Sequence, residues 1–386
     1  MENLSDFTSL KIGGPARKLV HAKTESELID FVKSADVNKE PLLILGGGSN
    51  VLIGDDGFAG TVVIVETKGN QLEVDACSGG MIEVSAGEDW DAFVLSSINK
   101  GFAGLETLSG IPGTVGGSPI QNIGAYGHEV SETIARVKTY DRKSKEIKSF
   151  SATECEFSYR DSIFKRTNNR YVVLTVTFQL RIGEQSDAIT YPELAKELQI
   201  EVGSKASTKS VRQAVLKIRE RKGMLLGKSN QSLKSAGSFF VNPIITKLQA
   251  DKLPAGAPKW QQPNGNVKTS AAWLLENAGV KRGEQLSGAK VSDLHVLAFT
   301  NSGSATAKDM VALARSAKAK VKEKFGQTAN EEEIVCKMSE PEFIEFALET
   351  IKETLEKLGY KRKGKKKMAK KNTTDSIHLA NVDLAR

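Results

Sequence analysis

Cysteine and histidine are scarce in this chain of 386 residues. The three cysteines, Cys77, Cys155 and Cys336, lie far apart without a CxxC spacing, and the four histidines are not paired. A zinc site needs clustered ligands, and a disulfide framework needs an even set of cysteines. The composition therefore predicts no bound metal and favours a reducing compartment, the cytoplasm.

Long hydrophobic runs are also absent. No apolar stretch approaches the roughly 20 residues that a membrane-spanning helix requires. The first residues, MENLSDFTSL, have neither the basic nor the apolar region of a signal peptide. We therefore expect a soluble intracellular protein without a membrane partner, long enough for two or three domains with their own cores.

Positive charge is concentrated in one segment. The run from Lys361 to Lys371 holds eight basic residues and no acidic one, and subtracting it from the formal net charge of +7 leaves −1. A nucleic-acid-binding body would carry a basic stripe interleaved with aromatic residues, and the remainder of the chain has none. We expect no nucleic-acid partner and interpret the basic run as a solvated tail, with binding to RNA or to an anionic membrane as the alternatives.

Glycine, by contrast, is abundant in one stretch. The 27 residues from Gly101 to Gly127 contain eight glycines, interleaved with leucine, isoleucine, valine and tyrosine. Each glycine loses backbone entropy on ordering and offers no side chain to pack, so the stretch is not the interior of a helix or strand. A flexible linker would lack the apolar residues. We therefore expect a loop that cradles a ligand on its backbone N–H groups.

A second glycine loop, residues 46–50 (GGGSN), lies between the apolar runs Pro41–Leu45 and Val51–Ile53. The chain contains no G-x-G-x-x-G, which disfavours a Rossmann dinucleotide site. Two alternatives remain open for this loop: a turn whose N–H groups hold phosphate, or a tight hairpin in which glycine only supplies positive φ. The segment 223–229 (GMLLGKS) is one residue too short for a P-loop, so we reject that motif.

Periodicity predicts sheet over about residues 61–190 and a separate α+β domain over about 218–327. Thr24 and Glu27 have the spacing of a capping box at the start of a helix. The expected strands include Thr61–Val65, Leu72–Ala76, Met81–Ala86, Ala135–Tyr140, Glu146–Phe150, Tyr171–Leu180 and Val291–Asn301, the last carrying His295. The expected helices include Trp90–Ile98, Val211–Arg221, Thr269–Val280, Ala305–Phe325 and Phe343–Leu358.

An ordered set of motifs resembles the UDP-N-acetylenolpyruvoylglucosamine reductase family, in the subgroup with a tyrosine loop. The motifs are KIGGPA at 11–16, LGGGSNVLI at 45–53, SGIPGTVGG with QNIGAYG and a glutamate within 109–129, YRDSIF at 159–164, AGSFFVNP at 236–243 and AAWLLENAGVKRG at 271–283. They cover roughly residues 4–337 in collinear order, and the ordered set is far more specific than any one motif.

The resemblance implies an α+β fold. An FAD-binding module of the vanillyl-alcohol-oxidase type, made of two α+β subdomains, would be joined by a smaller α+β substrate domain. The corresponding ranges are 1–65 and 66–217 for the two FAD-binding subdomains, 218–328 for the substrate-binding domain, 329–340 for a return segment carrying a catalytic glutamate, and 341–386 for a helix with the basic tail.

The resemblance also implies an activity. The family uses FAD and NADPH to reduce UDP-N-acetylglucosamine enolpyruvate to UDP-N-acetylmuramate, in the synthesis of peptidoglycan precursors for the cell wall. The partner would be a small-molecule UDP-sugar, and we expect a monomer. The alternative is another FAD-dependent oxidase or dehydrogenase on the same scaffold. A degenerate flavin-binding module, or a nucleic-acid binder acting through the basic tail, is a more distant alternative.

Site residues follow by matching motifs. The catalytic residues implied by the resemblance are Arg160 for the substrate carboxylate, Ser238 as proton donor, and Glu332 as a hydrogen-bond donor, with Glu333 as the alternative register for the glutamate. From the residues alone, Arg160 could instead pair with Asp161 or a surface carboxylate. The implied substrate-binding residues are Tyr191, Lys222, Asn242 and His295. The implied cofactor-binding residues are Gly46, Gly47, Gly48, Ser49, Asn50, Gly110, Ile111, Pro112, Gly113, Gly116, Gly117, Ser118, Asn122, Gly124, Ala125 and Tyr126.

Overall fold

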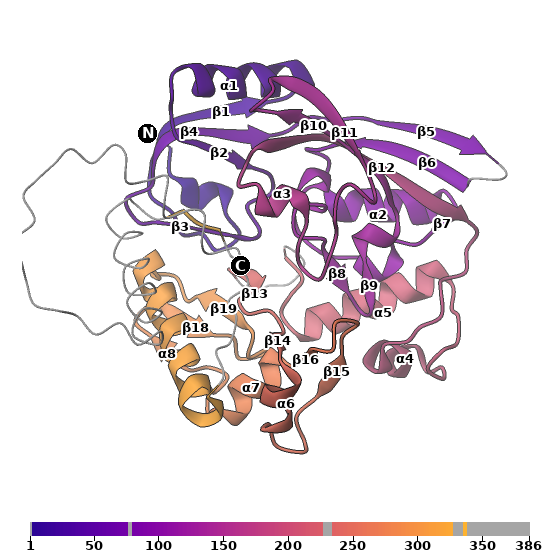
Figure 1. The fold of residues 1–386 in the computed structure, drawn as a ribbon, viewed down its shortest axis with the longest axis vertical. Helices are drawn as coiled ribbons and strands as arrows, with labels where there is room; N and C mark the ends of the chain where they lie inside the picture. Colours follow the sequence, from indigo (N-terminus) through magenta and orange to yellow (C-terminus); the bar gives the residue numbers. More distant parts are fainter. Residues whose placement is uncertain (1, 76–78, 227–233, 327–334, 338–386) are drawn as a thin grey trace, which may run out of the picture. The chain divides into compact units, whose positions relative to one another are not determined.

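The structure is a computed structural model that describes residues 2–75, 79–226, 234–326 and 335–337 (Figure 1). Glu332 and Glu333, the helix expected over Phe343–Leu358 and the basic run from Lys361 to Lys371 lie outside the described residues. None of the helices in the described ranges combines the length and the apolar character that crossing a bilayer requires.

The first subdomain is a parallel three-stranded sheet in the order β1-β4-β2, covered by one helix (Figure 1). Its elements are β1 (Ala16–Ala22), α1 (Glu25–Val37), β2 (Leu42–Leu45) and β4 (Phe58–Val65). The capping box predicted for Thr24 and Glu27 is confirmed at the start of α1. The helix buries Leu28 and Val32, which anchors its apolar face.

The glycine loop 46–50 is not the turn of a hairpin. The strand before it, β2, pairs with β4, whereas the strand after it, β3 (Val51–Ile53), pairs in parallel with β20 (Val335–Lys337). The loop therefore carries the chain from one sheet to another, and the hairpin alternative is wrong. Within the loop Gly48 has a positive φ of 58°, and a Cβ there would lie 1.8 Å from the Phe7 carbonyl oxygen.

The second subdomain is an antiparallel sheet in the order β11-β10-β12-β6-β5, with β7 paired to the end of β12. Its strands are β5 (Asn70–Asp75), β6 (Gly79–Ser85), β7 (Phe102–Ala103), β10 (Ile134–Asp141), β11 (Glu146–Ser151) and β12 (Tyr171–Ile182). The hairpin β8 (Gly124–Ala125) and β9 (His128–Glu129) lies outside this sheet. The helices are α2 (Trp90–Asn99), α3 (Ile163–Arg166), α4 (Pro192–Leu198) and α5 (Thr208–Arg221).

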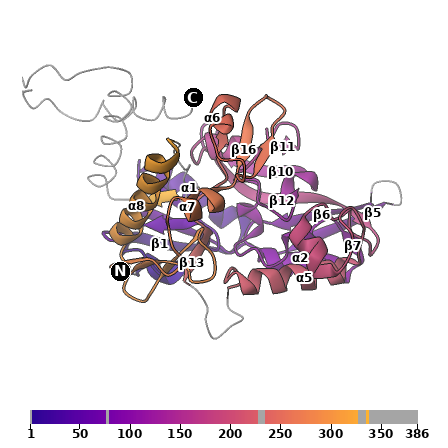
Figure 2. The ribbon, with the colours of Figure 1, turned by 90° about the horizontal axis from the view of Figure 1, so that it is seen from below.

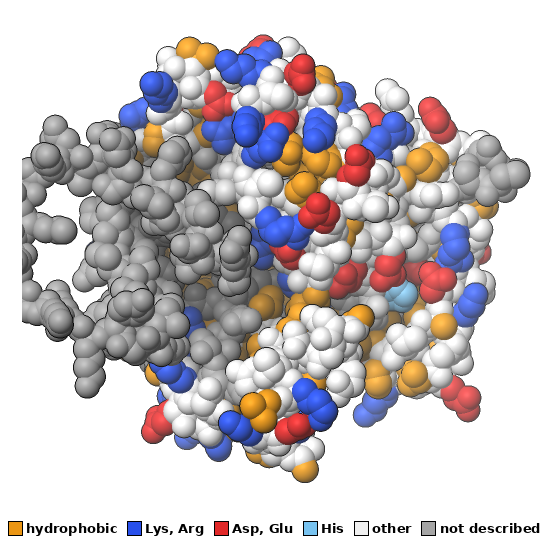
Figure 3. Space-filling view, viewed as in Figure 1, with side chains coloured by type: hydrophobic (Ala, Val, Ile, Leu, Met, Phe, Trp, Pro, Cys, Tyr) orange, Lys and Arg blue, Asp and Glu red, His pale blue; other side chains and the backbone are white. Residues whose placement is uncertain are grey.

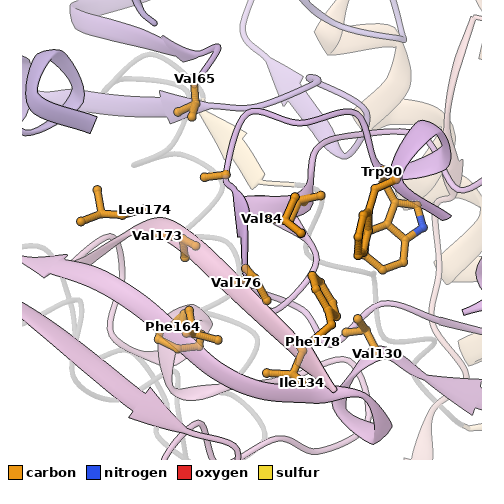
Figure 4. Close-up of a cluster of buried hydrophobic side chains, with 14 of the residues drawn as sticks. Val65, Val84, Trp90, Val130, Ile134, Phe164, Val173, Leu174, Val176 and Phe178 are labelled. Carbon is orange, nitrogen blue, oxygen red and sulfur yellow. The ribbon is translucent and has the colours of Figure 1, made fainter. Parts of the chain in front are cut away.

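An aromatic cluster forms the core of the second subdomain. The rings of Trp90 and Phe178 lie 6.0 Å apart, and both side chains are fully buried (Figure 4). Phe93 contacts both rings. The Trp90 indole N–H donates to the Leu108 carbonyl at 3.0 Å, so this core also holds the start of the glycine-rich stretch. Leu108 and Val115 are themselves fully buried, which contradicts the linker alternative for residues 101–127.

The third part contains two small sheets, in the orders β13-β19-β18-β17 and β14-β16-β15, with three helices. Its elements are β13 (Ser235–Ser238), β14 (Ile244–Ile245), α6 (Lys247–Asp251), β15 (Lys259–Gln261), β16 (Val267–Thr269), α7 (Ala271–Asn277), β17 (Gln285–Leu286), β18 (Ala289–Val291), β19 (Ala298–Asn301) and α8 (Ala307–Phe325). Leu10, Ile12 and Leu52 belong to the same buried cluster as the side chains of this part. The first residues of the chain therefore help to form its core.

The single strand predicted over Val291–Asn301 is wrong, because the chain turns back on itself there. β18 and β19 form an antiparallel pair, and His295 lies in the turn between them. The Ser292 hydroxyl accepts the Leu294 N–H, and His295 Nδ1 accepts the Leu297 N–H at 3.1 Å. Such side-chain bonds to nearby backbone compete with a continuous strand. The helix expected from Thr269 is likewise shorter, because Ser270 caps α7 one residue later.

Charges of both signs are mixed on the face seen in Figure 3, where Lys and Arg side chains alternate with Asp and Glu. A surface that binds nucleic acid through its phosphates would present a field of one sign. This face of the described residues has no such field.

Candidate active site

The two glycine loops meet in the folded chain. A Cβ built on Gly47 would lie 2.8 Å from Gly113 Cα, so the backbones approach as closely as glycine permits. The Ser49 hydroxyl donates to the Pro112 carbonyl at 3.0 Å and joins the loops directly. The fold thus brings together the two segments that the sequence assigned to one ligand.

The facing loops present unused hydrogen-bond donors. Within the described part of the chain, the N–H groups of Gly47, Gly48 and Ser49, and of Gly113 and Thr114, have no acceptor. Backbone amides left without partners are costly unless solvent or a ligand satisfies them. Several N–H groups on adjoining glycine turns form a concave anion site. The residues present therefore fit a pyrophosphate, the central group of FAD.

Other residues assigned to the cofactor use their polar groups within the protein. The Gly116 N–H donates to the Ala86 carbonyl at 2.8 Å, and the buried Ser118 hydroxyl donates to its own helical turn. The buried Asn122 amide donates to the Glu129 carboxylate at 2.6 Å. These groups shape the loop. Gly124 and Ala125 lie in the short strand β8, and Tyr126 follows with a positive φ of 52°.

The Arg160 side chain reaches back to the glycine-rich stretch. Its Nη2 donates to the Gly124 carbonyl at 2.8 Å, and its backbone has a positive φ of 56°, a strained conformation for a residue with a side chain. The Asp161 carboxylate pairs with Arg166 instead, so the ion pair between Arg160 and Asp161 that the sequence left open is not formed. Strain of this kind persists only where the surrounding structure fixes the conformation.

Glu129 lies in the electrostatic field of Arg160. Burial raises the pKa of the Glu129 carboxyl, although the hydrogen bond from Asn122 and the positive charges of Arg160 and Lys268 act in the opposite direction. Lys268 comes from β16 of the third part of the fold, and its ammonium lies 4.4 Å from the centre of the Tyr159 ring. The YRDSIF segment and the third part of the fold therefore meet at this point.

Ser238 ends strand β13, beside Ala298 of β19. The next residue, Phe239, is buried and stacks on Phe299 with ring centres 4.8 Å apart, so the backbone at Ser238 is held by the aromatic core. Ser238 itself is half-buried, and its hydroxyl has no hydrogen-bond partner among the residues that the structure describes. The hydroxyl is thus positioned by backbone and remains available to a ligand.

Lys222 and Tyr191 lie on one side of the site, at the junction of α4 and α5. Lys222 caps the C-terminus of α5, and its ammonium lies 2.5 Å from the Glu193 carboxylate in the first turn of α4. Tyr191 immediately precedes α4, and its ring packs edge-to-face on Tyr126 at 5.5 Å. Burial raises the pKa of Tyr126 to about 12, so its phenol is protonated at neutral pH.

His295 is neutral at physiological pH. Burial, and next the positive charge of Lys222, lower the pKa of His295 to about 4. Because Nδ1 accepts a backbone N–H, the ring proton is assigned to Nε2. Asn242 is used differently, since its Oδ1 accepts the Ala271 N–H at the start of α7 and its amide N–H₂ group remains a donor. The fold therefore brings Lys222 and His295 near each other.

Sequence reasoning missed Lys268, Arg219 and the pair Arg212 and Asp91. Arg219 donates to the Gly110 carbonyl at 3.1 Å, and Arg212 pairs with Asp91. These partners lie more than a hundred positions apart in the chain. No local pattern in the sequence could have identified them.

Models of two protein families match this chain, one in its N-terminal part and one in its C-terminal part. An FAD binding domain model matches residues 16–148, and a model of the UDP-N-acetylenolpyruvoylglucosamine reductase C-terminal domain matches residues 228–336. The UDP-N-acetylenolpyruvoylglucosamine reductase of Cutibacterium acnes is 48% identical over 328 residues, covering 84% of this chain and 86% of the relative. That of Thermobifida fusca is 43% identical over 343 residues, covering 86% of this chain and 96% of the relative.

A solved structure is similar as well. The crystal structure of UDP-N-acetylenolpyruvylglucosamine reductase (MurB) from Thermus caldophilus superposes with a TM-score of 0.58 at 25% sequence identity. The match covers 86% of this chain and 96% of that chain. Together with the FAD binding domain model, it confirms an α+β fold in which an FAD-binding module is followed by a smaller domain.

Proposed function

The chain belongs to the UDP-N-acetylenolpyruvoylglucosamine reductase family, and we propose that its two glycine loops, Arg160 and Ser238 form the active site. The protein reduces UDP-N-acetylglucosamine enolpyruvate to UDP-N-acetylmuramate with NADPH and FAD, in peptidoglycan precursor synthesis. The activity, the cofactors and the UDP-sugar substrate expected from the sequence are confirmed.

The approach of the two glycine loops carries the proposed site. Their unpaired N–H groups at Gly47–Ser49 and at Gly113 would hold the FAD pyrophosphate without a charged side chain, as nests of backbone amides do. FAD supplies the hydride relay from NADPH to the enolpyruvyl carbon farther from the ether oxygen. The other steps fall to side chains of this protein.

Arg160 would stabilise the negative charge that spreads onto the substrate carboxylate as the hydride arrives. A guanidinium offers two parallel N–H donors to a carboxylate. Its hydrogen bond to the Gly124 carbonyl and its fixed backbone preorganise it, and preorganised donors are the main source of such stabilisation. We assign Glu332 the role of a protonated hydrogen-bond donor that assists Arg160. Glu333 is the alternative for this role.

Ser238 would deliver a proton to the carbon that bears the ether oxygen. Its hydroxyl is held at the end of β13 and has no partner in the described residues, so it can turn toward the substrate. A serine hydroxyl is a weak acid, and a nearby cation favours the alkoxide that forms. Lys222 is the cation that we assign to this effect.

Four residues would bind the UDP-sugar. Lys222 and the neutral His295 supply a positive charge and an Nε2–H donor at one point of the site. Tyr191 lies exposed beside them at the start of α4, where its phenol can reach the diphosphate. The Asn242 side-chain oxygen accepts the N–H of Ala271 at the start of α7, so its NH₂ group can donate to the substrate.

We keep the domain ranges 1–65, 66–217, 218–328, 329–340 and 341–386 as a proposal. Support comes from the separate sheets of the three parts. We also propose a cytoplasmic monomer that binds neither nucleic acid nor membrane.

The visible absorbance spectrum of the purified protein tests the cofactor site first. We expect flavin bands at one flavin per chain, released on denaturation. Oxidation of NADPH that depends on UDP-N-acetylglucosamine enolpyruvate then separates the reductase from an oxidase, which would consume oxygen instead. A colourless protein that takes up no added FAD would contradict the assignment of the two loops.

A further inference from the structure

Helix α5 reaches the FAD loop through a buried ion pair. Arg212 of α5 is 7% exposed, and its guanidinium binds both carboxylate oxygens of Asp91, at 2.6 and 2.8 Å. Asp91 belongs to the first turn of α2, and α2 and α5 lie at the lower right of the view in Figure 2. Bidentate arginine–carboxylate pairs are the strongest and most directional of the ion pairs.

The same carboxylate holds the loop. Asp91 Oδ1 accepts the N–H of Gly110 at 2.6 Å, and Arg219, two turns along α5, donates from Nε to the Gly110 carbonyl at 3.1 Å. Both backbone groups of Gly110 are therefore bound by charged side chains. Gly110 has a positive φ of 70°, and a Cβ there would lie 2.8 Å from Leu216 Cδ2, so helix and loop are in direct contact.

Helix α5 also carries the lysine assigned to the substrate. Lys222 is the residue that caps its C-terminus, three positions after Arg219. The continuous helical backbone fixes the spacing between Arg219 and Lys222. The loop that faces Gly47 and the lysine that we assign to the UDP-sugar are therefore both attached to α5, through Gly110 at one point and through the helix end at the other.

We propose that Arg212 and Asp91 are positioning residues that fix the Gly110 peptide, set the position of the FAD loop, and join it to the helix that carries Lys222. The inference rests on the proposed function, in which Gly113, three residues after Gly110 in the same loop, helps to hold the FAD pyrophosphate. We assign neither residue a contact with the cofactor: Asp91 would act through the N–H of Gly110, and Arg212 through Asp91.

The alternative is an ion pair that only stabilises the fold, and the chain offers a matched control. Arg142, which follows β10, pairs with Asp36 of α1; their side chains are 23% and 25% exposed, against 8% and 25% for Arg212 and Asp91, and neither residue belongs to a glycine loop. Asp36 accepts from two guanidinium nitrogens of Arg142, as Asp91 does from Arg212. Equivalent substitutions in the two pairs therefore separate positioning from stability.

The experiment compares Asp91→Asn and Arg212→Lys with Asp36→Asn and Arg142→Lys in the full chain. FAD affinity is measured by fluorescence quenching on flavin-free protein, together with kcat, the KM for the UDP-sugar at saturating FAD, and the Tm of the flavin-free protein. For both variants of the positioning pair we expect the FAD Kd to rise about tenfold, because a hydrogen bond to a charged group is weakened.

The substrate readout tests the connection through the helix. We expect the KM for the UDP-sugar to rise in the Arg212→Lys protein with kcat nearly unchanged once FAD is saturating, and neither value to change in the control pair. Arg212→Lys keeps the charge but loses the bidentate geometry, so failure of lysine to restore FAD affinity supports positioning.

Equal FAD affinity in both pairs at matched Tm would overturn the proposal. Should Asp91→Asn not fold, Arg212→Lys alone decides between the two outcomes, since it leaves the carboxylate in place. Wild-type protein that binds no FAD would contradict the proposed function itself, whereas yellow, active wild-type protein with unaffected variants would contradict only this inference.

Discussion

The ammonium of Lys222 lies 2.5 Å from a carboxylate oxygen of Glu193. Lys222, which we propose binds the UDP-sugar, therefore already has an anionic partner that would compete with the substrate for its ammonium. A second ion pair, between Arg221 and Glu197, joins the same two helices at the surface. The junction of α4 and α5 thus contains two ion pairs, and only the Lys222–Glu193 pair involves a residue that we assign to the substrate.

Removing the competing carboxylate should tighten substrate binding. In the Glu193→Gln protein we expect the KM for the UDP-sugar to fall about two- to fivefold, because a partly exposed ion pair is worth about 0.2–1 kcal/mol. Steady-state kinetics at saturating NADPH provide the measurement. Glu197→Gln is the matched control and should leave KM unchanged; an equal fall in both variants would show that loosening of α4, and not competition, is the cause.

Replacing Ser238 by alanine should separate the two halves of the reaction. We expect flavin binding and flavin reduction by NADPH to persist, while reoxidation by the UDP-sugar slows by roughly 10²–10⁴-fold, the usual contribution of a positioned proton donor. Stopped-flow absorbance of the flavin measures both steps. Ser304→Ala, which changes an exposed serine just after β19, serves as the control, and near-normal reoxidation in the Ser238 variant would remove the proton-donor assignment.

The planar guanidinium group of Arg160 should be needed for catalysis. In the Arg160→Lys protein we expect kcat to fall about 10²-fold, as when one donor of a charge-stabilising site is lost, with FAD content and Tm nearly unchanged. Arg166→Lys is the control on the same segment, because Arg166 pairs with Glu156 and Asp161 at the surface. Comparable losses in the two variants would indicate a role in folding this segment instead.

Replacing Gly47 by alanine should push the two glycine loops apart. In the Gly47→Ala protein the new Cβ would lie 2.8 Å from Gly113 Cα. Overpacking of this kind costs about 1–3 kcal/mol, so we expect the FAD Kd to rise about tenfold or more, measured by titrating flavin-free protein. Gly256→Ala, whose Cβ would meet no atom within 4 Å, should bind FAD normally. Unchanged affinity in Gly47→Ala would mean that the loops do not need their close approach.

His295 should make stability depend on pH in the acidic range. Its pKa is about 4 in the folded protein, against 6.5 for an ordinary histidine, so the unfolded chain takes up the proton first as the pH falls. The free energy of unfolding therefore decreases as the pH falls from about 6.5 toward 4, and His295 contributes about 2 kcal/mol of the loss between pH 7.5 and pH 5.

Urea unfolding of wild-type and His295→Asn protein at these two pH values measures that loss. The opposite contribution of His128, whose pKa is raised by its hydrogen bond to Glu132, is present in both proteins and cancels in the comparison. The exposed pair of His21 with Glu66 provides a control, His21→Asn. The same change in the free energy of unfolding between pH 7.5 and pH 5 in the His295 variant as in the wild type would contradict the buried, neutral state of this residue.

Local pattern identified most elements of the fold. The strands around residues 61–65, 81–85 and 171–180 and the capping box at Thr24 follow from alternation and spacing, and the structure has them within a few residues. The error at Val291–Asn301 arose because an apolar run does not reveal a turn held by side-chain bonds of Ser292 and His295. Propensity reports what a segment can form and not where the chain must reverse.

The ordered motifs by themselves determined the family, the cofactor and the residue types of the site, because those features are carried by short segments. Only the tertiary structure decided the contacts. It brought Gly47 against Gly113, gave Lys222 the partner Glu193, and bound Gly110 to Asp91, which Arg212 holds from 121 positions away. Such contacts depend on how the helices, strands and loops pack. Local periodicity cannot predict them, because the partners are distant in the chain.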